Sequence, residues 1–493
     1  MLETFDIAVI GGGISGFSTA LRLQSKGFKT IVLESHGQLG GCAGFFTKQG
    51  FSFDVGATTL VDFINGGVGG NFFEEINVPL PKGEYLDYLA WLPDRQIVLY
   101  RDREKWNRER LLKIGSTNNH KDFWTLMDRV TDVFWQASRR NLKLPIQSVS
   151  DLWNLIRAIG VKNLFLSRFL NVSMSDVLKK FKLEKDAALT GLLAMLVEDT
   201  VHSSLDKAPF INAALGTTIR GAGLMRPEGG MKRFWQYLSE KYLEKGGTIK
   251  TGHKVTGFEK KSGVWKIETS KAGFLSRKII SSLPLDLTRQ IAPEHIKVKL
   301  EKYIQLNESY RGSAIVLFLG VREEAVERQT LTHHQILNSY EEPFGNGNNM
   351  FISVSSKGDN LSAPEGCRAV MISTHCGISE WQNLTKDSYD QKKKDIGNRL
   401  LTFAQKVYPN LDKELIVFET GTPRTYQKYT QRMDGSVGGY KQTLLNSNLK
   451  ATPHHFGERD FWLVGDNTWP GLGTVAGLMG SKIVSEYAGA TFG

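Results

Sequence analysis

Apolar positions near the start of the chain follow a strand–helix–strand order. Residues 7–10 form a short apolar run that is typical of a buried parallel strand. Residues 14–26 carry apolar side chains at helical spacing and are followed by Gly27, a favourable end for a helix. Residues 30–33 predict a second strand, which ends at Glu34. This β-α-β unit predicts an α/β fold with a Rossmann-type sheet.

The rest of the chain divides into a helical region and a mixed region. Residues 71–220 carry long amphipathic stretches with few glycines, so we predict mostly helices there. The chain closes with a predicted strand, a glycine-rich turn and a helix at 462–487. The other elements predicted after residue 220 are a helix at 231–245, strands at 248–260, 264–270, 277–282 and 313–320, and a helix at 388–408.

A glycine motif joins the first predicted strand to the first helix. In Gly11-x-Gly13-x-x-Gly16, the first glycine permits a tight turn, the second lets the backbone approach a pyrophosphate, and the third lets helix and strand pack closely. The helix N-terminus offers free N–H groups to the phosphates. Glu34 lies 21 residues after Gly13, where its carboxylate can accept hydrogen bonds from ribose hydroxyls. Together these features predict a dinucleotide site.

The segment after the second predicted strand indicates which dinucleotide is bound. Gly40-Gly41 and the later Phe53–Gly56 resemble the GG signature of flavoproteins such as amine oxidases, protoporphyrinogen oxidase and phytoene desaturase. In that resemblance the paired glycines let the backbone pass close to the pyrophosphate side of FAD. Those flavoproteins often have Arg after the two glycines, whereas this chain has Cys42. We interpret Cys42 as a small buried side chain without a redox role.

The C-terminal end supplies a second, independent match. Residues 463–466 and 469–475 resemble the closing flavin motif of the phytoene desaturase family. The resemblance implies that Asp466 bonds the ribityl chain, that Trp469 lies beside the flavin ring, and that the final helix begins at the flavin's pyrimidine end. A helix N-terminus in that place stabilises the negative charge of a reduced flavin.

The motifs occur in the same order as in the phytoene desaturase and carotenoid isomerase family, and the chain most resembles its bacterial acyclic-carotenoid desaturases. The resemblance implies the GG-signature flavoprotein fold, a Rossmann-type FAD-binding domain with an α+β substrate domain. We expect the FAD domain to comprise residues 1–70, 225–285 and 457–493, and the substrate and membrane-binding domain to comprise 71–224 and 286–456. The residues expected to bind FAD are Gly11, Gly13, Ile14, Ser15, Gly16, Glu34, Ser35, Gly40, Gly41, Cys42, Gly56, Ala57, Thr58, Val255, Ser282, Gly465, Asp466, Gly473, Thr474 and Val475.

Composition excludes several other classes. The three cysteines form no CxxC pair, so we expect neither a disulfide framework nor a metal site. The net charge is +11, but no known nucleic-acid motif accompanies it, and we expect no nucleic-acid partner. Glycines interrupt the N-terminal apolar run, and no apolar run is long enough to span a bilayer. We therefore expect no signal peptide and no transmembrane helix.

A polyene substrate would require contact with a membrane surface. Residues 139–170 combine basic and aromatic side chains with a single acid, Asp151, as an interfacial helix requires. We expect peripheral membrane association on the cytoplasmic side. The basic residues of this segment are Arg139, Arg140, Lys143, Arg157, Lys162 and Arg168.

The catalytic residues stay unknown at this stage, because flavin N5 carries the chemistry of such enzymes. Glu198, Asp199 and His202 are polar residues in an apolar stretch, and we interpret them as helix-end or surface residues. Adjacent His333 and His334 would point to opposite faces of a strand, which argues against one shared metal.

The resemblance implies FAD-dependent desaturation of an acyclic carotenoid or its precursor by hydride transfer to flavin, with a quinone or oxygen as possible electron acceptor. Cis-trans isomerisation of a carotenoid by a reduced flavin is an alternative within the family. Amine oxidation and retinoid saturation are further alternatives, and the substituted Arg argues against the first. A non-catalytic escort protein with the same fold is the fourth alternative.

Overall fold

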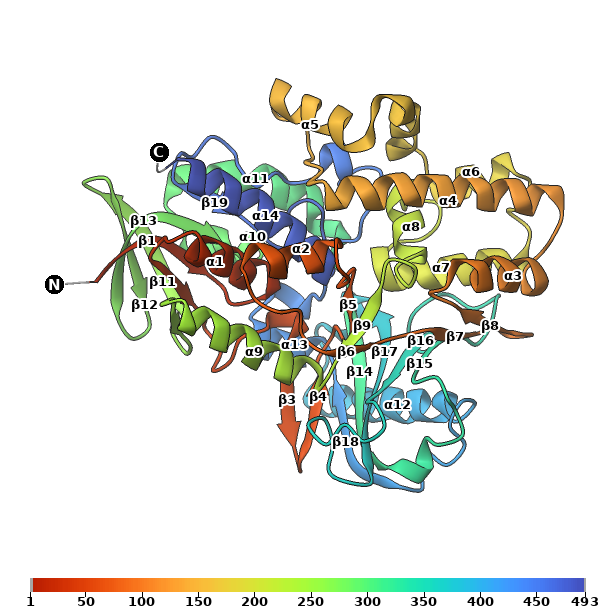
Figure 1. The fold of residues 1–493 in the computed structure, drawn as a ribbon. Coiled ribbons are helices and arrows are strands. Elements are labelled where there is room, and N and C mark those ends of the chain that lie inside the picture. The colour runs from red at the N-terminus through yellow and green to blue at the C-terminus, as the bar shows by residue number, and fades with distance from the viewer. Residues whose placement is uncertain (1–2, 492–493) are drawn as a thin grey trace.

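A seven-stranded sheet is assembled from three separated parts of the chain (Figure 1). The computed structural model describes residues 3–491. Strands β10, β2, β1, β13 and β19 run parallel, β12 pairs antiparallel with β13, and β11 at the edge pairs antiparallel with β12. The bounds are β10 (Thr248–Lys250), β2 (Thr30–Leu33), β1 (Thr4–Ile10), β13 (Gly273–Ser281), β12 (Val264–Thr269), β11 (Val255–Lys261) and β19 (Phe461–Leu463).

Helices cover both faces of this sheet, which explains why its central strand is apolar at every inner position. Ile7 and Val9 pack toward α1 (Ile14–Ser25) and α14 (Thr474–Ala490), whereas Ala8 and Ile10 belong to the core on the other face. Successive side chains of a strand point to opposite faces, so burial on both sides produces a continuous apolar run. The other covering helices are α9 (Gly230–Glu244), α10 (Leu285–Ile291) and α11 (Glu294–Asn307).

A second seven-stranded sheet lies beside the first and is mostly antiparallel. Strand β15 pairs in parallel with β7, and α12 (Lys386–Ala404) buries Leu400 and Ala404 in the core of this sheet. In spatial order the strands are β18 (Leu415–Gly421), β14 (Ser313–Arg322), β17 (Cys367–Cys376), β16 (Asn349–Val354), β15 (His333–Leu337), β7 (Tyr88–Trp91) and β8 (Gln96–Leu99).

The region 71–220 is mainly helical, as predicted, but it also contributes three strands. β7 and β8 form an edge hairpin of the second sheet, and β6 (Gly83–Tyr85) pairs with β9 (Leu224–Pro227). These short strands gain their stability from partners far along the chain, which local periodicity does not reveal. The helices of the region are α2 (Val68–Glu75), α3 (Arg103–Lys113), α4 (Asn118–Arg139), α5 (Val149–Ile159), α6 (Met174–Lys180), α7 (Ala187–Val201) and α8 (Phe210–Thr217), with 3-10 turns at η2 (Val161–Asn171).

Most other predicted elements agree with the structure apart from their ends. The strand predicted at 248–260 is instead two strands, β10 and β11, because the chain turns at Gly252, where φ is +63°. A left-handed φ favours glycine and interrupts a strand. The remaining elements are β3 (Phe45–Lys48), β4 (Phe51–Asp54), β5 (Leu60–Val61), α13 (Pro423–Thr430), η1 (Gly41–Ala43), η3 (Glu308–Tyr310), η4 (Glu323–Ala325), η5 (Ile378–Trp381), η6 (Met433–Gly435) and η7 (Asn448–Lys450).

Candidate active site

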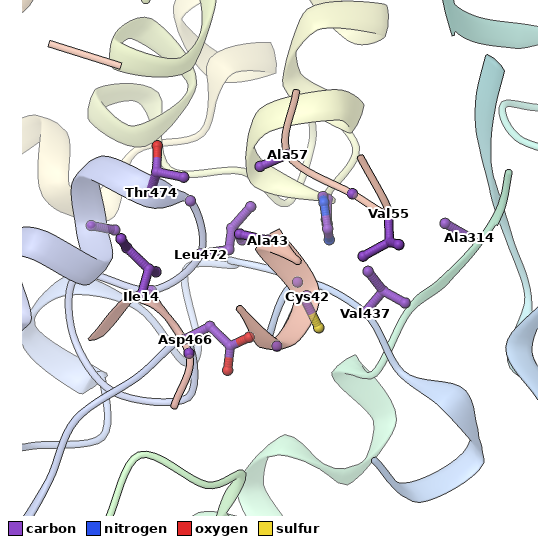
Figure 2. Close-up of a pocket in the computed structure, with 18 of the residues that line it drawn as sticks. Ile14, Cys42, Ala43, Val55, Ala57, Ala314, Val437, Asp466, Leu472 and Thr474 are labelled. Carbon is purple, nitrogen blue, oxygen red and sulfur yellow. The ribbon is translucent and has the colours of Figure 1, made fainter. Parts of the chain in front are cut away.

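One large cavity, of about 950 Å³, extends from the glycine turn after β1 to the second sheet and the helices α4, α7 and α8. Figure 2 shows Ile14, Asp466 and Thr474 on one side of this pocket, and Val55 and Ala314 on the other. The cavity therefore joins the part of the fold that carries the dinucleotide motifs to the part that has none.

Eighteen of the twenty residues expected to bind FAD line this cavity. Gly16 does not line it, because it faces the interior of the β1–α1 turn: a Cβ at this position would lie 2.4 Å from the carbonyl oxygen of Gly11. Val255 does not line it either, since its side chain is buried in the core on the other face of the sheet. The structure thus brings together segments near residues 11–15, 34–42, 56–58, 282 and 465–475.

The glycine turn and the GG segment form a backbone surface. Gly40 N donates to Gly12 O over 3.0 Å, and this bond holds the GG segment against the turn. Gly13 has open space where a Cβ would stand, and it opens α1. Free N–H groups at the start of α1 therefore face the cavity without side chains in the way, which suits a pyrophosphate.

Glu34 is fixed at the end of β2 by backbone donors. Gly12 N donates to one of its carboxylate oxygens over 2.7 Å, and His36 N donates to the other over 2.8 Å. Ser35 Oγ also donates to the second oxygen over 3.2 Å, so of the carboxylate's roughly four acceptor positions one remains, on the oxygen that Gly12 N contacts. This arrangement matches the predicted ribose contact.

Asp466 lies on the same side of the pocket as Ile14 and pairs with Arg432 (Figure 2). The Arg432 Nη2 to Asp466 Oδ2 distance is 2.7 Å, and both side chains are largely buried. Burial alone would lower the pKa of Arg432, but the Asp466 carboxylate raises it, so the guanidinium keeps its charge. Burial also raises the pKa of the Cys42 thiol, which favours the neutral thiol over a reactive thiolate. Sequence reasoning missed Arg432 because no motif surrounds it.

The start of α14 lies at the cavity. Within the described residues, Thr474 Oγ1 is buried without a hydrogen-bond partner, although its side chain lines the cavity. The group that this segment presents to the cavity is the N-terminus of α14, which begins at Thr474. The glycine turn, the Glu34 acceptor and this helix N-terminus therefore fit the pyrophosphate, ribose and ring edge of FAD.

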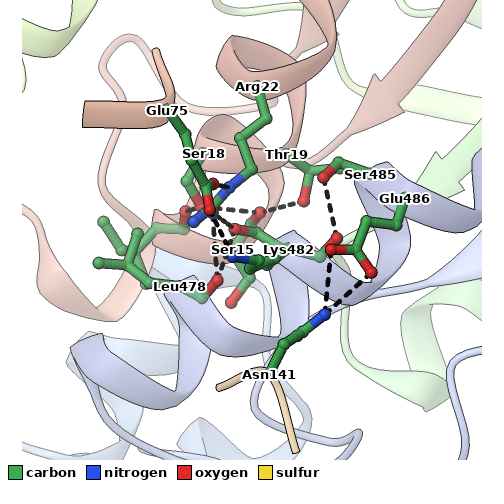
Figure 3. Close-up of polar contacts among 12 residues, drawn as sticks. Ser15, Ser18, Thr19, Arg22, Glu75, Asn141, Leu478, Lys482, Ser485 and Glu486 are labelled. Carbon is green, nitrogen blue, oxygen red and sulfur yellow. Dashed lines mark hydrogen bonds and ion pairs between the residues drawn. The ribbon is translucent and has the colours of Figure 1, made fainter. Parts of the chain in front are cut away.

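A polar network holds the two cradle helices together behind the cavity (Figure 3). The Arg22 side chain of α1 is buried, donates to Leu478 O over 3.1 Å and to Ser481 Oγ of α14, and pairs with Glu75 over 2.8 Å. Lys482 of α14 pairs with the same Glu75 carboxylate. These contacts fix the relative position of both helix N-termini that meet the cavity.

The far end of the cavity carries a polar cluster that sequence reasoning did not assign to a site. Asp199 and His202 line the cavity, together with Gln335 of β15 and His375 of β17. The centroids of the His202 and His375 rings are 4.5 Å apart. Burial is the main cause that holds the pKa of His202 well below its usual value, and the neighbouring His375 lowers this pKa further. Asp199 and His202 do lie at the end of a helix, as we interpreted them, but they face the cavity and not the outer surface. Helical periodicity could not show it, because the partners lie on strands far along the chain.

The histidine pair His333–His334 is buried and serves the core of the second sheet. His333 stacks on Tyr88 with ring centroids 5.1 Å apart, and His334 Nε2 lies 2.8 Å from the Tyr408 hydroxyl. Burial lowers the pKa of His334 to about 3, so this imidazole is neutral. The two rings point to opposite faces of β15, as the alternation of a strand requires.

The sequence matches the profile of the family described as "Flavin containing amine oxidoreductase" over residues 14–417. The chain belongs to this family. The family contains flavin, and its cofactor FAD fits the site described above. Together with the sequence relatives below, this makes the protein an FAD-dependent oxidoreductase.

Known relatives narrow the class. The chain is 23% identical to a prolycopene isomerase from Daucus carota, over 99% of this chain and 80% of the relative. It is 22% identical to a lycopene-forming phytoene desaturase from Pantoea ananas, over 96% of both chains. A putrescine oxidase structure superposes with a TM-score of 0.65 at 11% identity, covering 99% of each chain, which supports the fold alone. The homologues are thus carotenoid desaturases and isomerases, as the resemblance implied.

Proposed function

We propose that this protein is a carotenoid desaturase that dehydrogenates a long acyclic polyene at a membrane surface. The observation that carries the proposal is the course of the cavity. It begins at the glycine cradle and continues between apolar side chains of α4 and α8 to Leu142, Leu144 and Leu170. A single continuous space is therefore available for a flavin and for a long apolar chain beside it.

In this proposal the chain's own residues bind and orient both molecules. The cradle at Gly11–Gly13 and Glu34 holds the dinucleotide, and the start of α14 holds the pyrimidine end of the ring. The apolar walls Phe134, Ile211 and Leu215 exclude water and align the polyene. When bound, FAD supplies the acceptor for a hydride. A quinone or oxygen would take up the electrons afterwards.

The route by which the polyene enters is the exposed surface of α5 and η2, which protrudes from the body of the molecule (Figure 1). Val149, Trp153 and Val161 are 74%, 63% and 73% exposed. Leu142 and Leu144 before this segment, and Leu170 after it, line the cavity. An exposed apolar surface continuous with an apolar cavity suits a lipid-dissolved substrate.

Charge on the same surface favours an anionic membrane. Arg140, Arg157, Lys162 and Arg168 are exposed there. Arg139 and Lys143, also expected to be part of the basic face, instead pair with Asp62 and Glu486. No helix in the described residues is long and apolar enough to cross a membrane.

A pigment assay tests the proposal. The chain would be expressed in a host that accumulates phytoene, lycopene and their cis isomers, and the extracted pigments separated. Products with a longer conjugated chromophore would support desaturation. Unchanged pigments in cells that contain the yellow, FAD-loaded protein would contradict the carotenoid proposal and direct attention to amines or retinoids.

Isomerisation is the second candidate, and a specific observation favours it. Prolycopene isomerases of three plants are 23–24% identical to this chain over 99–100% of its length. The same assay separates the two reactions, because an isomerase changes the isomer ratio and leaves the number of double bonds unchanged.

A further inference from the structure

Two adjacent acids, Glu198 and Asp199, lie in the last turn of α7, which ends at Val201. The negative end of a helix dipole lies there, so this position disfavours carboxylates. Asp199 lines the cavity, whereas Glu198 does not. An acid placed against both a helix C-terminus and an apolar cavity reduces stability, which suggests that Asp199 has a chemical role.

The surroundings of Asp199 hold its carboxyl in one orientation. Gln335 Nε2 of β15 donates to Asp199 Oδ2 over 2.8 Å. Burial raises the pKa of Asp199, an effect that His375, the Gln335 hydrogen bond and Arg220 oppose and that Glu198 increases. Tyr88 of β7 also faces this group, and His202 follows it at the helix end. The result is a carboxylate that is more basic than an ordinary aspartate.

The end of α7 is also tied to the flavin side of the cavity. Gln442 N donates to Val201 O over 3.1 Å, and Gln442 Nε2 donates to Pro470 O over 2.8 Å. Pro470 belongs to the turn that leads into α14, whose first residue is Thr474. One residue, through its backbone and its side chain, thus links the Asp199 turn to the turn before the helix that meets the flavin.

We propose that Asp199 is the proton acceptor of the reaction carried out in this cavity. The proposal rests on the proposed desaturation of a –CH2–CH2– unit. One C–H bond breaks and its hydrogen leaves with the electron pair as a hydride to bound FAD. The neighbouring C–H bond breaks, its electrons form the new C=C bond, and its proton goes to the Asp199 carboxylate. The acid then releases this proton to water.

A titration without substrate tests the acid itself. Infrared difference spectra of the FAD-loaded protein should be recorded as the pH rises. They should show a protonated-carboxyl band that disappears only at a pH above the range in which an ordinary aspartate titrates. Asp199→Asn should lack this band, and Asp206→Asn, which changes an exposed acid outside the cavity, should keep it. A band that stays in Asp199→Asn, or one that titrates in the ordinary range, would overturn the assignment whatever the substrate is.

Flavin reduction after anaerobic mixing with the polyene tests the proton transfer. Because a general base typically contributes 10²–10⁴-fold, Asp199→Asn should slow flavin reduction by about 100-fold or more. Chemical reduction by dithionite should be unchanged, and Asp206→Asn should react like the wild type. The wild-type rate should increase as the pH rises through the raised pKa, because only the carboxylate accepts a proton. Asp199→Glu should restore part of the rate.

The outcomes separate the two proposals. If wild-type protein fails to act on any polyene, the proposed function is wrong while the infrared titration still decides the state of Asp199. If the wild type reacts and Asp199→Asn reacts equally fast with the same pH profile, Asp199 is not the proton acceptor. If Asp199→Asn loses FAD, its rate is uninformative, and the proposal is tested by the pH dependence of the wild-type rate and by the rate of Asp199→Glu. A wild-type rate that does not follow the raised pKa would overturn the proposal.

Discussion

The two ends of the cavity are built in different ways. At the dinucleotide end, the surface is backbone: the glycine turn, the GG segment and the N-termini of α1 and α14. At the other end, the surface consists of side chains from α7, β15 and β17, among them Asp199, Gln335 and His375. Backbone surfaces bind a shared cofactor and tolerate few substitutions, whereas side-chain surfaces can be changed to suit a substrate.

The largest expected effect comes from a change at the backbone end. In Gly16→Val the new Cβ would lie 2.4 Å from Gly11 O and 2.7 Å from Ser282 Cβ, so the β1–α1 turn must shift. Overpacking of this kind displaces the backbone that would contact the pyrophosphate, and we expect complete loss of the cofactor, so that the protein purifies without yellow FAD. Gly37→Ala is the matched control, since nothing lies within 4 Å of its Cβ, and it should keep FAD. Full flavin content in Gly16→Val would show that the turn is not part of the cradle.

A second prediction concerns the buried ion pair at the edge of the cradle. Arg432→Met leaves the Asp466 carboxylate buried without its cation, and breaking such a pair costs about 3–5 kcal/mol. The exposed pair Arg289–Glu301 is the comparison, because Arg289→Met should cost no more than about 1 kcal/mol. Chemical denaturation of both FAD-loaded variants measures the difference. Equal losses would mean that the Arg432–Asp466 pair is exposed to solvent in the functional protein.

The smallest expected effect concerns the surface through which substrate would enter. Trp153→Ser removes an exposed apolar side chain of α5, and full burial of such a side chain contributes about 1.5–3 kcal/mol. We expect weaker sedimentation with anionic phospholipid vesicles and unchanged thermal stability. Leu112→Ser, on α3 and 78% exposed, is the control and should bind as the wild type does. Equal binding by both variants would place the membrane contact elsewhere.

The sequence predicted the backbone end of the cavity almost completely. Glycines at Gly11 and Gly13 and an acid at Glu34 are required at fixed spacing by the local turn, so a single stretch of sequence carries the signal. Gly16 and Val255 are the exceptions: Gly16 packs inside the β1–α1 turn, and the face of the sheet to which the Val255 side chain points depends on how β11 pairs with β12.

The side-chain end could not be predicted in the same way. Asp199, Gln335 and His375 come from three elements that only the second sheet brings together, and the hairpin of β7 and β8 within that sheet was itself not predicted. Arg432 is similar, since its partner Asp466 is 34 residues away and on another element. Pairings of this kind are set by tertiary packing, and no local pattern records them.

The measurement that tests the central claim most directly is an anaerobic single turnover with purified, FAD-loaded protein and an acyclic carotenoid in vesicles. The account predicts that the yellow flavin absorbance bleaches while the product gains conjugated double bonds, two electrons being taken up for each new bond. The account would be contradicted if the flavin did not bleach and if neither the number of double bonds nor the isomer ratio changed, with either oxidised or chemically reduced protein.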